Sequence, residues 1–277
     1  MLADDDDALL IAGGQTLVPM LAMRLARPTI LVDILRLPEL WGIRRENGSL
    51  TLGATTRQVE AERSPLVAAD LPLLAKALPW VGHQPTRNRG TVGGSVANAD
   101  PSAEIPLIAA TLGAEIAIRS REEERVIAAE DFFVGAMSTA LEPGFCVSEL
   151  RFPVWQEGRL GVGFHEISAR KSDFAYVSAA AQVSADEDGK CLNVALGLGG
   201  LSDRPVRIPI ASLVGESLST PNVLESVSGS VADACDTFDL RSDIHASANY
   251  RRRLAIALAQ RAMRDAVDGA LQVRRET

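Results

Sequence analysis

The sequence predicts an α+β fold in two parts, with short strands and helices mixed in the N-terminal part and an antiparallel sheet plus helices in the C-terminal part. Two observations favour it. Short continuous apolar runs alternate with helical patterns in the first half of the chain, and runs of alternating polarity followed by long helical patterns occupy the second half. Between them, Pro153 to Gly161 mixes Pro, Gly and polar residues, which predicts a domain boundary and therefore domains at 1–155 and 156–277.

The bulk composition is that of a globular protein, because 47% of the 277 residues are hydrophobic and 23% are charged. A formal net charge of −8 argues against a nucleic-acid surface. No apolar run reaches the roughly 18 to 20 residues of a membrane span, and no basic segment precedes an apolar one as in a secretory signal. We therefore expect a cytoplasmic protein without a membrane span.

The sequence contains no recognisable metal site or catalytic group. Its three cysteines and three histidines are dispersed: Cys146, Cys191, Cys235, His83, His165 and His245. Iron–sulfur clusters and zinc sites need grouped ligands, and nucleophilic catalysis needs a base beside its nucleophile. We expect reduced, buried cysteines, no metal ligand and no catalytic residue in this chain.

The N-terminus is predicted to form a small parallel βαβ unit. Ala8 to Ala12 is a short apolar run that predicts a buried strand, and it ends at Gly13-Gly14. Thr16 to Arg24 has helical spacing, and Thr29 to Ile34 predicts the second strand.

The next elements follow from local patterns. Leu50 to Gly53 predicts a strand, and the pair Thr55 and Gln58 has the spacing of a capping box that starts a helix. Leu66 to Val81 predicts a helix that prolines divide into pieces.

Four further elements precede the boundary. They are a helix at Ala103 to Leu112, a strand at Ala114 to Arg119, a helical turn at Glu130 to Gly135 and a strand at Cys146 to Phe152.

Beyond the boundary, 163–168, 175–185 and 191–198 predict a meander with a hairpin turn at Asp186 to Gly189. Thr220-Pro221 has the residues of a helix start.

The final helix is predicted over Ser247 to Val267. Tyr250, Leu254 and Leu258 form its apolar stripe, which places most of the arginines 251–253 on a solvated or partner-facing side.

Two glycine pairs, Gly13-Gly14 and Gly93-Gly94, are the main functional signal. Glycine lets backbone N–H groups approach a ligand closely, and successive amides before a helix form an anion site. Two such loops suit the two adjacent phosphates of a dinucleotide, although structural turns would also explain either pair. The usual dinucleotide signature is absent, because Gly161-x-Gly163 and Gly197-x-Gly199 lack the third glycine.

Short polar side chains surround the second pair. Ser95 and Asn98 suit hydrogen bonds to phosphate or ribityl hydroxyls, and Glu104 follows at a helix start. Asp100 either contributes to this site or caps the helix, with Pro101 as the first helical residue.

Five stretches, 12–34, 81–106, 169–180, 196–209 and 245–258, closely resemble the FAD-binding (medium) subunit of molybdenum hydroxylases, the carbon monoxide dehydrogenase and xanthine dehydrogenase-like family. The resemblance covers nearly the whole chain. It implies a PCMH-type FAD-binding domain of two subdomains, about 1–52 and 53–155, followed by a C-terminal flavoprotein domain.

The resemblance also implies the cofactor-binding residues. Backbone amides of 12–16 and 91–95 would face the diphosphate, Val81 and Val147 would lie along the cofactor, and Phe174 would cover the flavin ring. Together with Asp100 and His165, which the residue pattern itself suggests, the predicted cofactor-binding set is Ala12, Gly13, Gly14, Gln15, Thr16, Val81, Thr91, Val92, Gly93, Gly94, Ser95, Asn98, Asp100, Glu104, Val147, His165 and Phe174.

The chain departs from the family's pattern twice. Family members often carry a lysine where this chain has Phe164-His165-Glu166. Either His165 supplies the positive charge in place of that lysine, or His165 is a strand histidine whose hydrogen bonds are satisfied by neighbouring residues. Family members also carry a strand and helix before the first glycine pair, so we expect either a missing start or a first subdomain completed differently.

By resemblance, a large partner subunit holds the molybdenum cofactor, a small one holds two [2Fe–2S] clusters, and this chain passes their electrons from FAD to an external acceptor, in a dimer of heterotrimers. Carbon monoxide, an aldehyde, a purine or another N-heterocycle fits as substrate, and NAD, a quinone or another carrier as acceptor. A stand-alone FAD oxidoreductase and a non-catalytic scaffold that has lost the flavin are the alternatives.

Overall fold

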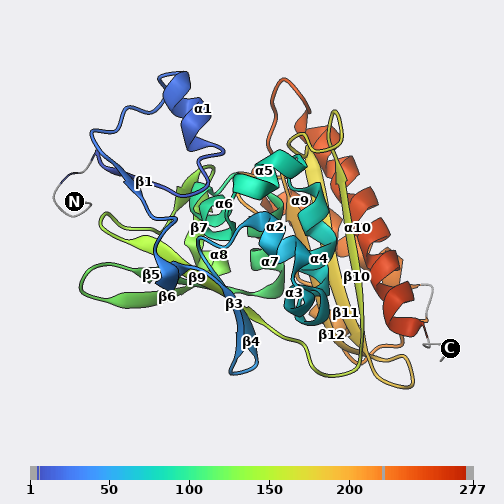
Figure 1. Ribbon diagram of the computed structural model, residues 1–277. Coiled ribbons are helices and arrows are strands. Elements are labelled where there is room, and N and C mark those ends of the chain that lie inside the picture. Colours follow the sequence, from blue (N-terminus) through green and yellow to red (C-terminus); the bar gives the residue numbers. More distant parts are fainter. Residues whose placement is uncertain (1–4, 6, 220–221, 273–277) are drawn as a thin grey trace.

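The N-terminal parallel βαβ unit is present, but its strands are not buried as predicted, because Leu9 and Leu31 are exposed and the other apolar strand residues are only half-buried. The computed structural model describes residues 5, 7–219 and 222–272 (Figure 1). Strands β1 (Leu9–Ile11) and β2 (Leu31–Asp33) pair in parallel, and helix α1 (Leu17–Ala22) connects them. Helix α1 buries none of its residues, so it is held mainly by its connections to the two strands.

A five-stranded antiparallel sheet follows, in the order β3-β4-β9-β5-β6. Its strands are β3 (Ile43–Glu46), β4 (Ser49–Gly53), β9 (Cys146–Pro153), β5 (Glu115–Arg119) and β6 (Glu124–Ala128). The predicted strands β4, β5 and β9 are confirmed. The edge strands β3 and β6 were not predicted, because few of their side chains are buried and neither has an apolar alternation.

Short helices and turns surround this sheet. They are η1 (Pro38–Leu40), α2 (Gln58–Arg63), α3 (Pro65–Asp70), α4 (Pro72–Ala77), η2 (Leu78–Trp80), α5 (Gln84–Arg89), α6 (Val92–Asn98), α7 (Glu104–Leu112), α8 (Ala129–Phe132) and the strand pair β7 (Phe133–Gly135) and β8 (Ser138–Thr139). Prolines open α3, α4 and η2, as expected for a helical stretch divided by proline. The predicted turn at Glu130 to Gly135 divides into α8 and β7.

The predicted capping box at Thr55 and Gln58 is wrong. The Thr55 hydroxyl donates to the carbonyl of Leu40 at 2.9 Å, and α2 begins only at Gln58. The Glu60 carboxylate instead accepts from the N–H of Arg57 at 2.9 Å. The capping pattern is therefore shifted by two residues, because a contact with a distant turn holds the threonine.

The C-terminal part contains the predicted meander. Strands β10 (Arg159–Ile167), β11 (Val177–Ala185), β12 (Cys191–Gly199) and β13 (Val206–Arg207) form one antiparallel sheet. The Asp186 N–H donates to the Lys190 carbonyl at 3.0 Å, which closes the predicted hairpin. A 3₁₀ turn, η3 (Ala211–Leu213), precedes helices α9 (Asn222–Thr237) and α10 (Ala248–Leu271), and the predicted helix start at Thr220-Pro221 lies outside the described residues.

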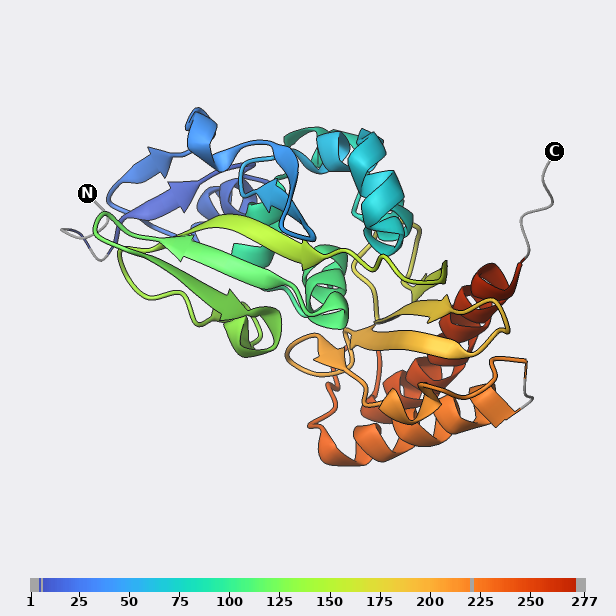
Figure 2. The same ribbon diagram turned by 90° about the horizontal axis from the view of Figure 1, so that it is seen from below.

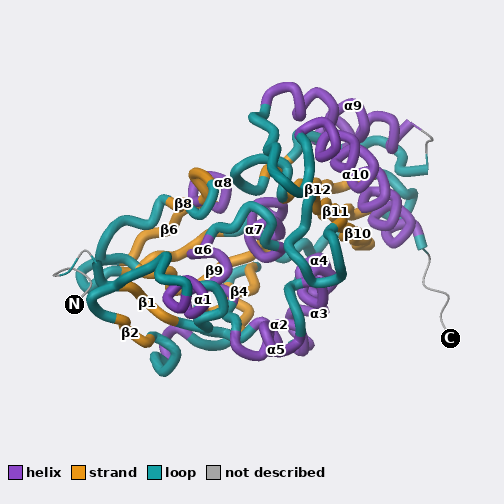
Figure 3. Tube along the Cα trace, turned by 90° about the horizontal axis from the view of Figure 1, so that it is seen from above, coloured by secondary structure: helices purple, strands orange, loops and turns teal. Residues whose placement is uncertain are grey.

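Helices cover both faces of this C-terminal sheet (Figures 2 and 3). Helix α10 packs on β10 and β11 from one side, with α9 beside it. Helix α7 packs on β11 and β12 from the other side and buries all nine of its residues. Because α7 also packs on β9 of the first sheet, it joins the two halves of the molecule.

One arginine of the last helix lies on the buried face, although the arginines were predicted on the polar side. Arg251 is buried, whereas Arg253 is exposed as predicted and Tyr250 is more than a third exposed. The buried face of α10 consists mainly of alanines together with Leu258 and Met263. The predicted stripe was therefore rotated, because alanine carries too weak an apolar signal to mark a helix face that fits closely against glycine-containing strands.

No helix in the described part of the chain is long and apolar enough to span a bilayer.

Candidate functional site

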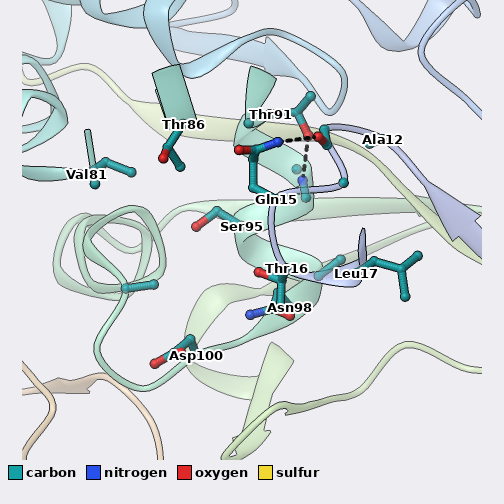
Figure 4. Close-up of a pocket in the computed structure, with 18 of the residues that line it drawn as sticks. Ala12, Gln15, Thr16, Leu17, Val81, Thr86, Thr91, Ser95, Asn98 and Asp100 are labelled. Carbon is teal, nitrogen blue, oxygen red and sulfur yellow. Dashed lines mark hydrogen bonds between the residues drawn. The ribbon is translucent and has the colours of Figure 1, made fainter. Parts of the chain in front are cut away.

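The first glycine loop, residues 12–16, connects the end of β1 to the start of α1. Gly14 has a φ of +67°, which glycine adopts without strain. The Gln15 side-chain amide donates to the Gly13 carbonyl at 2.9 Å and fixes the loop (Figure 4). Among the described residues, no group accepts a hydrogen bond from the N–H groups of residues 13–16. The loop therefore presents a row of free backbone donors.

The second glycine segment, residues 91–95, differs from the first because its amides are already engaged. The Thr91 hydroxyl caps α6 by accepting from the Gly94 N–H at 3.0 Å. The Gly93 N–H donates to the Ala54 carbonyl at 2.9 Å, and that of Val92 to Thr56 at 2.9 Å. The resemblance led us to expect free amides here, but this segment offers close backbone approach and side chains such as Ser95.

The chain brings the two glycine regions into contact. A Cβ atom on Gly13 would lie 2.5 Å from the Arg89 carbonyl oxygen and 2.7 Å from the Gly90 Cα, so only glycine fits there. Gly90 in turn directly precedes the second segment. A side chain on Gly93 would overlap Ala54, which fixes α6 against the end of β4.

Both loops line one cavity of about 1100 Å³. This volume is slightly above the roughly 300 to 1000 Å³ of ordinary ligand sites, as expected for a long ligand. Gln15 and Thr16 of the first loop face Ser95 and Asn98 of α6 across it (Figure 4).

Fifteen of the residues expected at a cofactor site line this cavity. They are Ala12, Gly13, Gly14, Gln15, Thr16, Val81, Thr91, Gly93, Gly94, Ser95, Asn98, Asp100, Glu104, Val147 and Phe174.

Val92 and His165 do not line the cavity. Val92 is fully buried in the hydrophobic core. His165 faces α10, where its Nε2 lies 3.0 Å from a carboxylate oxygen of Asp265. Because successive residues of a strand point to opposite faces, the histidine is turned away while its neighbours face the first domain. The structure thus favours a histidine satisfied by its neighbours.

Asp100 belongs to the cavity wall rather than to a helix cap. Its Oδ1 accepts from the N–H of Ser102 at 2.9 Å, in a turn before α7. Helix α7 begins only at Glu104, with Ala103 as its N-cap, so the capping interpretation is wrong.

The cavity is bordered by the loop between β10 and β11. Phe174 on this loop is 74% exposed although it lines the cavity. Ser172 has a φ of +70°, and Arg170 pairs with Asp173 at 3.1 Å. An exposed aromatic side chain at the edge of a cavity is available to cover a planar ligand.

The part of the cavity wall at the start of α7, which we call the floor, contains a buried carboxyl group. Glu104 is 9% exposed at the start of α7. Burial raises its pKa to about 7, the Asp100 charge adds to this, and its own backbone N–H and Arg87 oppose it. Arg87 is itself paired with Glu62 at 2.8 Å.

Sequence reasoning missed a second carboxyl group, that of Glu166 on β10. It is 9% exposed, and neither of its oxygens has a hydrogen-bond partner among the described residues. Burial raises its pKa to about 8, and the charge of Glu104 contributes. The strand period could have found it, since Phe164 and Glu166 share the face opposite His165.

Arg251 supports the wall beside the exposed loop. It donates to the Gly200 carbonyl at 2.9 Å, to the Tyr176 carbonyl and to Asp243 at 2.6 Å. Desolvation opposes ionisation of Asp243, but N–H donors from Ala246 and His245 together with Arg251 lower its pKa to about 2. This ion pair holds the end of the loop at Tyr176.

The arrangement can bind a long anionic ligand. Free amides, hydroxyls and an exposed aromatic ring provide binding and orientation. No group of three or more metal-ligating side chains occurs in residues 5, 7–219 and 222–272. A flavin dinucleotide fits the free donors, the polar wall and the cavity volume.

Comparison with known proteins gives matches over nearly the whole chain. Residues 1–155 match the family described as FAD binding domain in molybdopterin dehydrogenase, and residues 163–266 match the CO dehydrogenase flavoprotein C-terminal domain. The alpha subunit of the 6-hydroxypseudooxynicotine dehydrogenase complex of Paenarthrobacter nicotinovorans is 35% identical, over 98% of this chain and 90% of that protein. The carbon monoxide dehydrogenase medium chain of Afipia carboxidovorans is 33% identical, over 93% and 88%. The crystal structure of quinoline 2-oxidoreductase from Pseudomonas putida 86 superposes with a TM-score of 0.89 at 38% identity, covering 98% of this chain and 93% of that one.

Proposed function

This chain belongs to the family of FAD-binding medium subunits of the molybdenum hydroxylases, and from that premise we propose that it carries FAD in its cavity and transfers electrons. It receives them from [2Fe–2S] clusters on a partner subunit and passes them to an external acceptor. The observation that carries the proposal is the contact between the two glycine regions on one cavity, with the donors of residues 13–16 free.

Bound FAD would supply the redox chemistry, by accepting electrons and passing them on. This chain's residues bind and orient it. The free N–H groups of residues 13–16 would donate to the diphosphate, and Ser95 and Asn98 would hydrogen-bond to phosphate or ribityl oxygens. The exposed ring of Phe174 would cover the flavin ring.

The proposed binding set comprises the fifteen cavity-lining residues named above, without Val92 and His165. We also propose a division of the chain into an FAD-binding domain at 1–155, with subdomains at about 1–52 and 53–155, and a C-terminal domain at 156–277.

The iron–sulfur clusters and the molybdenum cofactor belong to a small and a large partner subunit. The three cysteines of this chain lie far apart, so they offer no Cys₄ arrangement. Two relatives of this chain are named as a subunit of a dehydrogenase complex and as a medium chain, which supports a multi-subunit complex. A dimer of heterotrimers in the cytoplasm is the arrangement that we propose.

Reconstitution of the purified apo chain with FAD tests the proposed cofactor. We expect bound flavin absorbance in the wild type and a Kd raised at least tenfold in Gly13→Ala, because the new Cβ pushes the first loop off Arg89 and Gly90. Gly229→Ala is the control, since a Cβ on that helical glycine meets nothing within 4 Å.

Two outcomes would contradict the proposal. A wild-type chain that never retains flavin would support the scaffold alternative. A reconstituted chain that a substrate bleaches without partner subunits would support the stand-alone oxidoreductase.

A further inference from the structure

Three unpartnered polar atoms lie together on the face of the C-terminal sheet that is turned towards the first domain. Glu166 on β10 pairs in register with Ser178 on β11, which pairs in turn with Gly199 on β12. Both carboxylate oxygens of Glu166 and the hydroxyl of Ser178 are buried and have no partner among the described residues. Buried polar groups are normally hydrogen-bonded, so this group needs an explanation.

The start of α7 brings a second carboxyl group to this place. A Cβ on Gly199 would lie 2.6 Å from the Ser178 hydroxyl oxygen, 3.3 Å from Leu107 of α7 and 3.5 Å from the Pro101 carbonyl oxygen. The α7 segment therefore lies over Gly199 and Ser178, and Ser178 is the register partner of Glu166. The charge of Glu104 reaches Glu166 from there. Glu104, the first residue of α7, also lines the cavity, so one carboxyl of the pair faces the ligand space and the other lies behind it.

Among the residues that the structure describes, no cation pairs with Glu166. His165 points to the opposite face of β10, and Lys76 of α4 donates to the Val162 carbonyl and pairs with Asp265. Ser178 lies opposite Glu166 on β11, and Gly199 lies opposite Ser178 on β12. Neither of these two residues carries a charge.

Around Glu104, Asp100 adds a negative charge, and the cation that opposes it, Arg87, is already paired with Glu62. Two buried carboxyl groups without a counter-ion favour sharing protons over a double negative charge.

We propose that Glu104 and Glu166 form a proton-binding pair at the floor of the cavity, and that the pair takes up a proton from solvent when a flavin nucleotide binds. The step converts one carboxylate into a carboxylic acid, and no electron is transferred. This inference rests on the proposed function, because it takes the flavin nucleotide as the ligand.

Binding changes the environment of the pair in two ways. The ligand displaces water from the open side of Glu104, and its diphosphate brings negative charge into the same cavity. Both changes disfavour an ionised carboxyl group and raise its pKa further. Because the bound state then holds more protons, the affinity falls as the pH rises, by at most about tenfold per pH unit for each proton taken up.

The test is calorimetric titration of the apo full-length chain with FAD, between pH 7 and 8, in two buffers of different ionisation enthalpy. The difference in heat gives the number of protons taken up, and it does not depend on enzyme activity. We expect net uptake in the wild type and an FAD Kd that rises with pH across this window.

Two variants test whether the protons taken up on FAD binding go to Glu104 and Glu166. Glu166→Gln keeps the side-chain shape, and we expect it to lose roughly half of the uptake or more, since one of the two proton-binding groups is gone. Glu142→Gln is the control: this carboxyl lines the same cavity but is exposed and pairs with Arg125, and its variant should take up as many protons as the wild type.

The possible failures are distinguishable. Wild-type binding of FAD without proton uptake overturns this inference alone, and so does full uptake in Glu166→Gln. A wild-type chain that binds no FAD overturns the proposed function and this inference with it. If Glu166→Gln does not fold, the wild-type proton count and its pH dependence still decide the matter.

Discussion

Arg251 has one of the largest fully buried side chains in the structure, although this side chain carries a charge. Its guanidinium holds together three segments that are far apart in the sequence, because it donates to Tyr176, Gly200 and Asp243. A helical stripe cannot predict this, since the periodicity of α10 is compatible with an arginine on its polar side. The partners of the charge come from the residue before β11, the residue after β12 and the loop before α10.

Replacing Arg251 by methionine should destabilise the protein by about 3 kcal/mol or more. The variant leaves two carbonyl oxygens and the Asp243 carboxylate without their donor, and breaking a buried pair in this way is costly. Differential scanning calorimetry would measure the fall in Tm. Arg253→Met on the same helix is the control, since that arginine is exposed, and a similar fall in both variants would contradict the role of Arg251.

Among the elements, α10 and β10 show how closely a helix can approach a sheet when glycine lines the strand. A Cβ on Gly163 would overlap the carbonyl oxygen of Ala262, and a Cβ on Gly161 would overlap that of Ala266. Small residues on both elements thus allow backbone-to-backbone contact. In the sequence the same glycines resembled an incomplete dinucleotide signature, whereas their role in the fold is packing.

Gly163→Ala should therefore destabilise the protein by about 1 to 3 kcal/mol, the usual cost of an extra methyl group in a packed core. The clash is with backbone rather than with a side chain that can rotate, so the upper part of this range is expected. Urea unfolding would measure it. In Gly229→Ala nothing opposes the methyl group, and a loss of stability equal to that of Gly163→Ala would refute the packing argument.

Most elements with a buried face could be predicted from the sequence, whereas the edge strands β3 and β6 could not. The strands β10, β11 and β12 and the helix α7 carry strong apolar patterns, and the structure contains them. Strand β6 exposes almost every side chain, so only its pairing with β5 makes it a strand. The pattern of apolar and polar residues in a segment reflects which side chains are buried. An edge strand buries few side chains, so its sequence carries little of this pattern.

At the scale of the whole molecule, the pair of Glu104 and Glu166 lies where the first domain meets the C-terminal sheet. The folded state raises the pKa of Glu166 from the ordinary 4.5 to about 8, so it favours the neutral acid. The stabilisation that this proton provides is complete below pH 4.5 and is lost progressively as the pH rises towards 8.

Glu166→Gln should remove this loss, because the amide is neutral at every pH. The variant should have a Tm close to that of the wild type at pH 5 and a higher Tm at pH 8. Thermal unfolding followed by circular dichroism at the two pH values measures the difference. Parallel changes of Tm with pH in variant and wild type would show that Glu166 ionises freely in the folded protein.

The sequence by itself determined the two glycine pairs and the family, together with the strands and helices whose apolar faces follow a period, and it predicted the positions that we expect at the cofactor site. These are local properties, because a glycine pair or an apolar alternation can be identified from a few neighbouring residues. Only the tertiary structure decided which amides remain free, where Arg251 finds its acceptors, and that Glu104 and Glu166 share a buried interface. Each of these depends on contacts between segments far apart in the chain, and burial and partnership, which set the charge of a side chain, arise only when those segments pack.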